Sequence, residues 1–268
     1  MIRTDYHVHT NFSSDSQATM ESMIEKAIEL GYTRICFTDH MDYDFPKSYG
    51  LPFVFDVEDY AKTIKGFKEK YKEDISILMG IECGMRPYLS TRYEELIKSY
   101  PFDFVICSSH LVGTKDPYHK DYWEGCTEEE GISRYFETIL ENIHEFDNFD
   151  VYGHLDYVVR YGPTQNMNYS YATHKTILDN ILTTLIQKGK GIEVNTAGYK
   201  YGLGSPHPTK EIISRYLELG GTILTIGSDA HKPEHMHFAF DEARSLLLSL
   251  GVTHYTVFEN RTPIQLPL

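Results

Sequence analysis

The chain has 268 residues, of which 41% are hydrophobic and 24% are charged. This composition excludes a disordered chain, and the length is ample for one large α/β domain or barrel with a full core. The formal net charge of −14 argues against a protein whose main work is to hold DNA or RNA by the phosphates, although bound metal ions could still attract a small phosphorylated substrate.

Short apolar runs that favour strands alternate with amphipathic runs that favour helices. The predicted strands are 2–9, 34–38, 76–81, 103–108, 151–154, 192–195, 222–227 and 255–258. The predicted helices are 19–30, 57–72, 92–99, 127–146, 171–188, 209–219 and 236–250. Thr19 is suited to cap the first helix and Gly31 to end it. Repeated strand–helix units predict a parallel sheet, and with no repeat or linker in the sequence we expect one domain over residues 1–268.

The cellular compartment is suggested by what the sequence lacks. The first residues lead directly into a predicted strand without a charged and then apolar leader, and no apolar run approaches the roughly 20 residues that span a bilayer. The four cysteines show no CxxC spacing, and three of them lie in apolar strand-like runs where reduced core residues are expected. We therefore expect a cytoplasmic protein with no membrane partner.

Histidine and carboxylate side chains gather at the ends of the predicted strands. His7 and His9 are two residues apart in the first strand, so their side chains share a face and form half of a metal site. The whole set of expected metal ligands is His7, His9, Asp15, His40, Glu82, His110, His154, Asp229 and His231. Because the chemistry of parallel sheets gathers at the C-terminal ends of the strands, ligands from six strand ends favour a closed or nearly closed barrel over an open sheet.

The alternative for any one of these residues is an ordinary polar loop position. Six of the thirteen histidines lie at strand ends beside acidic residues, which exceeds what chance would place there, whereas Asp15 could also belong to a solvated loop before a helix. Six further histidines are expected at the surface: His119, His144, His174, His235, His237 and His254. Histidine and carboxylate ligands without thiolates suit Zn, Fe or Mn, and nine of them could hold two or three divalent ions.

Six motifs resemble those of the PHP (polymerase and histidinol phosphatase) family, and closely its histidinol-phosphate phosphatase branch. They are Asp5-x-His7-x-His9, Thr38-Asp39-His40, Gly80-Ile81-Glu82, Ser108-Ser109-His110, Gly153-His154-Leu155-Asp156 and Gly227-Ser228-Asp229-Ala230-His231, in the family's order over nearly the whole chain. The resemblance implies a distorted (β/α)7 TIM-like barrel with a trinuclear metal site at the C-terminal ends of the strands. It places His7, His9, Glu82 and Asp229 at one ion, Glu82 as a bridge with His110 and His154 at the second, and Asp15, His40 and His231 at the third.

The resemblance also implies hydrolysis of L-histidinol phosphate to L-histidinol and phosphate in histidine biosynthesis. Metal ions would neutralise the phosphate dianion and activate a water, so no protein nucleophile is required. Arg160 is the first candidate for binding the phosphate, since a guanidinium matches phosphate oxygens as a fork, and Lys200 and His207 are the second. A surface salt bridge is the alternative for Arg160, and for Lys200 the two readings are evenly balanced. The expected catalytic residues are Glu82, Asp229, Arg160 and His207.

Two other segments and two other functions stay open. Asp42-Tyr43-Asp44 has the spacing of an aspartyl-nucleophile motif, but the following Phe45-Pro46 departs from it, so we expect these residues to line a pocket or to be solvated. The loop Leu111–Gly125 could be a lid or plain surface packing. The chain could also be another PHP phosphoesterase acting on nucleotides or short oligonucleotides, or a non-catalytic metal-binding or polymerase-associated module. The excess of acidic over basic residues weighs against long nucleic acid as the substrate.

Overall fold

The computed structural model describes residues 1–50 and 52–268. The strands are β1 (Thr4–Val8), β2 (Arg34–Phe37), β3 (His40–Met41), β4 (Ser76–Gly84), β5 (Phe104–Ser108), β6 (Val151–Tyr152), β7 (Gly191–Asn195), β8 (Leu224–Gly227), β9 (His254–Glu259) and β10 (Thr262–Pro267). The α-helices are α1 (Met20–Glu29), α2 (Val57–Lys70), α3 (Ser90–Ser99), α4 (Lys120–Trp123), α5 (Glu128–Glu145), α6 (Lys175–Gln187), α7 (Ala197–Lys200), α8 (Lys210–Glu218) and α9 (Phe240–Ser249).

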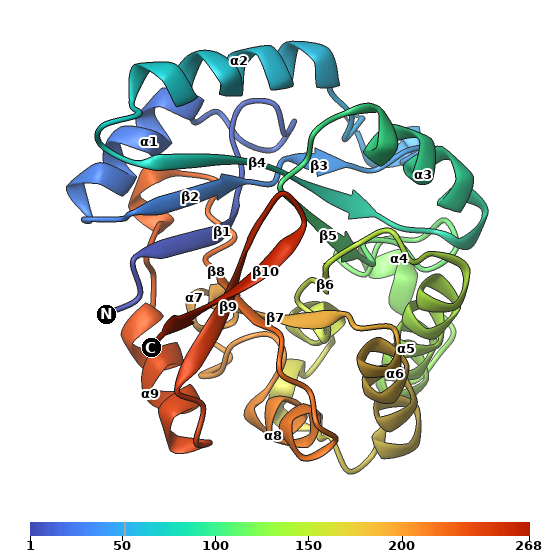
Figure 1. The fold of residues 1–268 in the computed structure, drawn as a ribbon. Coiled ribbons are helices and arrows are strands. Elements are labelled where there is room, and N and C mark those ends of the chain that lie inside the picture. The colour runs from blue at the N-terminus through green and yellow to red at the C-terminus, as the bar shows by residue number, and fades with distance from the viewer. Residues whose placement is uncertain (51) are drawn as a thin grey trace.

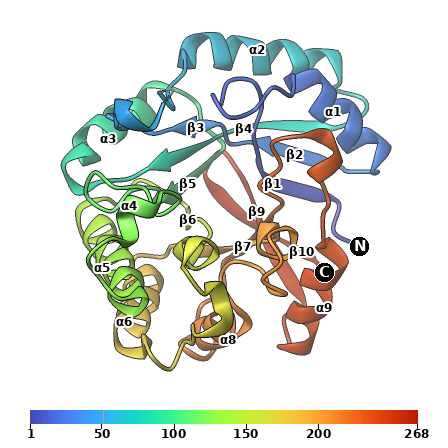
Figure 2. The ribbon, with the colours of Figure 1, turned by 180° about the vertical axis from the view of Figure 1, so that it is seen from behind.

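Seven parallel strands form a nearly closed barrel with helices around its outside (Figures 1 and 2). The strands are hydrogen-bonded in the order β1-β2-β4-β5-β6-β7-β8, and the short β3 also pairs with β4. Between β8 and β1, the Asp229 N–H donates to the His7 carbonyl at 2.9 Å and the His9 N–H donates to the Ala230 carbonyl at 2.9 Å. The predicted (β/α)7 barrel is therefore confirmed.

Local sequence signals set the ends of the main helices. The Thr19 side chain accepts a hydrogen bond from the Ser22 N–H at 3.1 Å, as expected for the N-cap of α1. Gly31 follows that helix with a φ of +72°, a conformation that glycine adopts without strain. Helix α5 begins with a reciprocal capping box between Thr127 and Glu130.

Most predicted elements are confirmed within a few residues, but two helices were predicted too long at their start. Helix α9 begins at Phe240 rather than at 236, because His237 and Ala239 have φ values of +63° and +55°, which no α-helix contains. Helix α6 begins at Lys175 rather than at 171. Strand β10 was not predicted; its prolines at 263 and 267 are compatible with a strand at the edge of a sheet, where β10 lies.

A C-terminal hairpin lies across one mouth of the barrel. Figure 1 shows β9 and β10 crossing in front of the parallel strands. The Tyr6 hydroxyl donates to the Phe258 carbonyl at 2.8 Å, and the rings of Phe104 and Phe258 pack with centroids 5.2 Å apart. This contact closes the N-terminal end of the barrel and leaves the C-terminal ends of the strands for chemistry. Among the residues described, no helix has the length and apolarity to cross a membrane.

Candidate metal centre

The nine predicted ligands all reach the C-terminal mouth of the barrel. Each follows or ends a strand: His7 and His9 belong to the end of β1, Glu82 to β4, and the others to β3 or the loops after β1, β5, β6 and β8. Strand β3 begins at His40, whose register partner is Glu82 on β4. The barrel therefore converts scattered sequence positions into one cluster, as the alternation of strands and helices predicted.

Glu82 lies at the middle of this cluster and is fully buried. Its Oε1 atom lies 2.8 Å from Nε2 of His154 and 3.1 Å from Nε2 of His110. Its Oε2 atom lies 2.8 Å from Nδ1 of His40, 3.4 Å from Nε2 of His7 and 3.6 Å from Nε2 of His9. One carboxylate thus faces imidazoles from both sides, which is the geometry that a bridging ligand needs.

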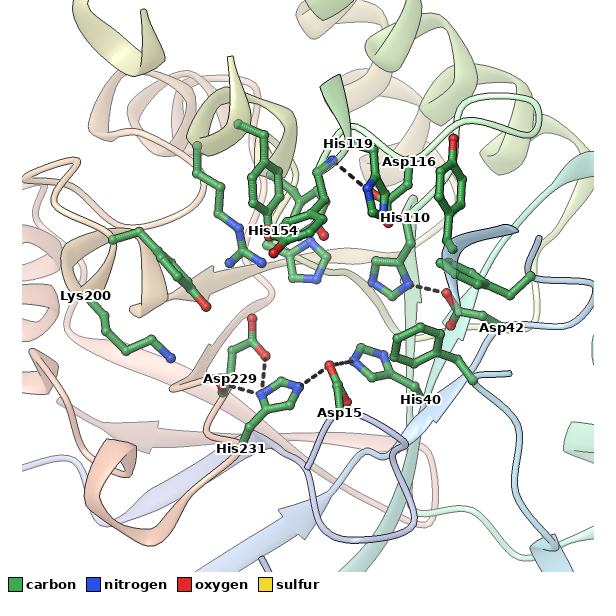
Figure 3. A pocket seen from close by; sticks show the side chains of 18 of the residues that line it. Asp15, His40, Asp42, His110, Asp116, His119, His154, Lys200, Asp229 and His231 are labelled. Atoms are coloured by element: carbon green, nitrogen blue, oxygen red, sulfur yellow. Dashed lines mark hydrogen bonds and ion pairs between the residues drawn. The ribbon is translucent and has the colours of Figure 1, made fainter. Parts of the chain in front are cut away.

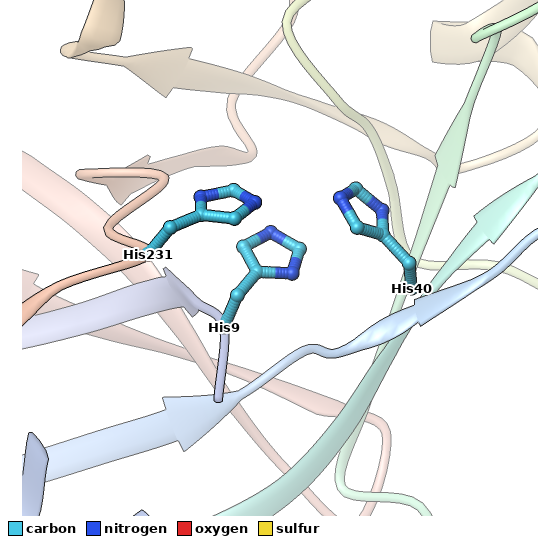
Figure 4. A group of neighbouring side chains, drawn as sticks. All are labelled: His9, His40 and His231. Atoms are coloured by element: carbon cyan, nitrogen blue, oxygen red, sulfur yellow. The ribbon is translucent and has the colours of Figure 1, made fainter. Parts of the chain in front are cut away.

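Asp229 and Asp15 extend the cluster toward its open side. Asp229 Oδ1 lies 3.4 Å from Nε2 of His9, and Asp15 Oδ2 lies 3.1 Å from Nε2 of His231 and 3.6 Å from Nε2 of His40. Figure 4 shows His9, His40 and His231 converging, and the centroid of the His9 ring is 4.2 Å from that of His40 and 4.1 Å from that of His231. Asp15 therefore contacts two histidines of the cluster while its side chain stays 41% exposed.

Buried atoms without hydrogen-bond partners test whether this cluster fits metal ions. Within residues 1–50 and 52–268, the unpartnered atoms include Nε2 of His7 and Nε2 of His9, each 3.4 Å from a carboxylate oxygen of the cluster. A buried polar atom without a hydrogen-bond partner raises the free energy of the folded protein. A metal ion that accepts the lone pairs of several such atoms would remove this penalty. The donor set of imidazoles and carboxylates, in groups of three with ligand atoms within 4.8 Å, therefore fits divalent metals.

The electrostatics of the cluster also favour added positive charge. Burial alone would lower the pKa of His40, but Glu82 and Asp15 raise it well above its ordinary value. Burial alone would raise the pKa of Glu82, yet the neighbouring histidines, His7 foremost, hold it well below its ordinary value. In the described part of the chain no lysine or arginine pairs with Glu82 or Asp229. The carboxylates thus favour the protonated forms of His7, His40 and His110, in the place that metal ions would take.

Two carboxylates that the sequence analysis did not assign to the centre hold its histidines. Glu193 on β7 has Oε1 2.6 Å from Nδ1 of His7, and Asp42 has Oδ2 2.7 Å from Nδ1 of His110. A carboxylate at Nδ1 fixes the tautomer and turns Nε2 toward a metal. A sequence signal existed for Asp42, because it stands two residues after His40 in an extended segment and so shares its face.

Glycine makes room for both of these carboxylates. A Cβ on Gly84 would collide with the carboxyl group of Asp42, and a Cβ on Gly227 would collide with His7 and Glu193. These two glycines are the last residues of β4 and β8, and they allow side chains at the centre to approach the backbone closely.

Comparison with known proteins agrees with this geometry. The sequence model of the PHP domain matches residues 5–197. The chain belongs to the PHP-domain family. A histidinol-phosphatase of Lactococcus lactis is 31% identical over 96% of this chain and 95% of its own length. The crystal structure of histidinol phosphate phosphatase from Lactococcus lactis complexed with zinc, L-histidinol and phosphate covers 98% of both chains, at 31% identity and a TM-score of 0.90.

The centre of this PHP domain opens into a cavity of about 460 Å³ (Figure 3). Arg160 and Lys200 line it together with His110, His154 and Asp229. The Arg160 guanidinium lies over the rings of Tyr157, Tyr161 and Tyr201, at 4.4, 4.7 and 4.2 Å from their centroids. Both side chains predicted to bind phosphate, Arg160 and Lys200, therefore line the same cavity as candidate metal ligands. Asp42 lines the cavity as expected, whereas Asp44 is about half exposed.

Other predicted positions differ from expectation. His207 is buried and does not line the cavity, and its Nδ1 lies 2.5 Å from Asp156 Oδ1; its contact with phosphate stays a prediction. His174 was expected at the surface but is 5% exposed, because it packs beside Phe136 and Tyr169. His119 and His235, also expected at the surface, line the cavity.

The loop 111–125 contributes three residues to the rim of the cavity: Asp116, Tyr118 and His119. It contains the short helix α4, which the sequence did not predict, and Tyr122 within it is buried with its hydroxyl donating to the Gly131 carbonyl. This part of the loop is packed onto the barrel. Whether the loop moves as a lid stays a prediction.

Proposed function

We propose that this PHP domain is a metal-dependent phosphomonoesterase that hydrolyses L-histidinol phosphate to L-histidinol and phosphate. The observation that carries the proposal is the placement of Arg160 and Lys200 on the same cavity as the cluster centred on Glu82. A phosphate ester needs both an anchor for its oxygens and a site that activates water, and the cavity is of the size that small ligands occupy. The activity of the Lactococcus lactis relatives supports the choice of substrate.

The proposed ligand groups follow the contacts around Glu82. His7, His9, Glu82 and Asp229 would hold one ion, Glu82 with His110 and His154 a second, and Asp15 with His40 and His231 a third. We propose two or three ions of Zn, Fe or Mn, with zinc the first choice because the Lactococcus structure contains it. When bound, these ions would neutralise the phosphate dianion and lower the pKa of a water near phosphorus.

The remaining chemistry falls to side chains of this chain. Arg160 would bind two phosphate oxygens through its planar fork and hold the ester in line with the centre. The tyrosine rings stacked on its guanidinium fix that fork and keep water from one of its faces. Lys200, whose pKa burial lowers, would add a second positive charge at the cavity wall.

A substrate panel tests the proposal. Purified protein loaded with zinc or manganese is assayed with L-histidinol phosphate, AMP, a short DNA strand and phenyl phosphate. We expect kcat/KM for L-histidinol phosphate to exceed the others by at least about 100-fold, as differential binding of the whole substrate allows. Preference for AMP or DNA would favour a nucleotide phosphoesterase. Metal binding without hydrolysis of any ester would favour a non-catalytic module.

A further inference from the structure

We propose that the Asp116 carboxylate binds a cationic group of the substrate, the ammonium or the protonated imidazole, and so selects for L-histidinol phosphate among phosphate esters. The inference rests on the proposed function and deepens it. It concerns the end of the cavity away from Lys200, where the phosphate is not expected to bind. In Figure 3, Asp116 lies on the side of His110 and Asp42, and Lys200 lies across the cavity.

Asp116 is buried, lines the cavity and lacks a positive partner. It is 9% exposed, and its Oδ1 accepts one hydrogen bond, from the Tyr118 N–H at 2.8 Å. Within the described residues no lysine or arginine forms an ion pair with it, and its Oδ2 has no hydrogen-bond donor. Aspartate is almost never buried in this way unless it is paired, so an unpaired oxygen at a cavity wall is a place for a ligand cation.

The carboxylate is held in place by the loop that carries it. The Tyr118 N–H donates to the Asp116 carboxylate, and the His119 N–H donates to the Asp116 carbonyl. The His119 ring stacks on Tyr49 with centroids 4.2 Å apart and an interplanar angle of 8°. The Tyr49 hydroxyl donates to Asp121 at 2.8 Å, which connects the loop to the segment 47–49. A preorganised carboxylate loses little freedom when it binds a cation.

The charges around Asp116 agree with this role. Burial raises the pKa of Asp116 and Asp42 adds to the rise, whereas His110 and His119 lower it. A substrate cation beside Asp116 would stabilise the charged carboxylate and so offset the free-energy cost of its burial. Asp42, the other buried carboxylate on this side, already has His110 as a partner at its Oδ2, although its Oδ1 has no hydrogen-bond partner among the described residues. Rings of Phe45, Phe53 and Tyr157 line the same cavity and could pack against the imidazole.

Asp116→Asn is the test, with Glu124→Gln as the matched control. Asparagine keeps an oxygen for the Tyr118 N–H but loses the charge, and Glu124 is an exposed acid in the same loop whose change alters the net charge equally. With the metal-loaded enzyme, Asp116→Asn should lower kcat/KM for L-histidinol phosphate by about 10- to 100-fold and leave phenyl phosphate, which carries no cation, within about twofold. Glu124→Gln should leave both unchanged.

Two analogues identify the group that is recognised. A loss of kcat/KM in Asp116→Asn with 2-amino-3-phenylpropyl phosphate, but not with 3-(imidazol-4-yl)propyl phosphate, assigns Asp116 to the ammonium; the reverse assigns it to the imidazole. If Asp116→Asn loses kcat/KM equally with all four esters, or loses none with L-histidinol phosphate, the inference about Asp116 is overturned and the proposed function is not. If the unaltered protein does not hydrolyse L-histidinol phosphate, the proposed function fails and the inference fails with it.

Discussion

The Oδ2 atom of Asp42 lies 2.7 Å from Nδ1 of His110, and both side chains are buried. The bond leaves Nε2 of His110 directed at Glu82 Oε1, 3.1 Å away. Asp42 therefore acts on the proposed metal centre through His110 and belongs to the residues that position it.

We predict that Asp42→Asn weakens metal binding without abolishing the fold. The amide would no longer accept a charge-assisted bond from the His110 ring, and loss of such partners typically costs about 10- to 100-fold in metal affinity or activity. Metal titration of the variant and kcat/KM at saturating metal measure the two effects. Asp44→Asn, at an exposed carboxylate two residues away, serves as the control. Equal metal affinity in both variants would show that Asp42 has no positioning role.

We predict that Glu82→Ala and His154→Ala each reduce hydrolysis by about 10³-fold or more, since Glu82 would bridge two of the proposed ions and His154 would bind one of them. Glu82→Ala should lower metal content more than His154→Ala does. Glu82 contacts five histidines of the centre, whereas His154 would offer one nitrogen to one ion. Elemental analysis and circular dichroism distinguish loss of metal from loss of fold. His144→Ala, at an exposed site on α5, should change neither. Near-normal turnover with full metal content would remove either residue from the centre.

The pH dependence of metal binding gives a further prediction. Burial alone would lower the pKa of His110, but Asp42 and Glu82 raise it to about 10 in the metal-free protein. Below that pKa the ring carries a proton that a metal must displace, so metal affinity should rise with pH. Competition with a chromophoric chelator between pH 6 and 8 should show about a tenfold gain in affinity per pH unit for each proton released. A flat profile would mean that the ligands are already deprotonated.

The sequence predicted the barrel because its strands and helices alternate with clear periodicity, and it predicted which side chains meet because parallel strands end on one edge. It missed Glu193, since a single acid within an apolar strand carries no sign of which neighbour it will face. It did not predict that His207 is buried, because a loop position says nothing about burial; Nδ1 of this ring lies 2.5 Å from Asp156 Oδ1. It also missed the left-handed backbone conformations before α9, because His237 and Ala239 adopt them and no glycine in the sequence indicates them.

The Arg160 guanidinium provides the last prediction. It is stacked by three tyrosine rings on the cavity wall, and its Nε has no hydrogen-bond partner within the described residues. Arg160→Ala should cost about 2–4 kcal/mol of transition-state stabilisation, or about 30- to 1000-fold in kcat/KM, because a charge-assisted bidentate contact with phosphate is lost. Arg160→Lys should recover only part, since an ammonium lacks the planar fork.

The effect of Arg160 should appear on phosphate and not on the metals. Unlike Glu82→Ala, the Arg160 variants should keep full metal content, and inorganic phosphate should inhibit them more weakly than it inhibits the unaltered protein. Arg134→Ala, at an exposed arginine on α5, controls for the loss of one positive charge. If Arg160→Ala kept both its metals and its kcat/KM, the tyrosine-stacked guanidinium would serve the packing of the cavity wall alone. Lys200, which lines the same cavity, would then be the first candidate for holding the phosphate.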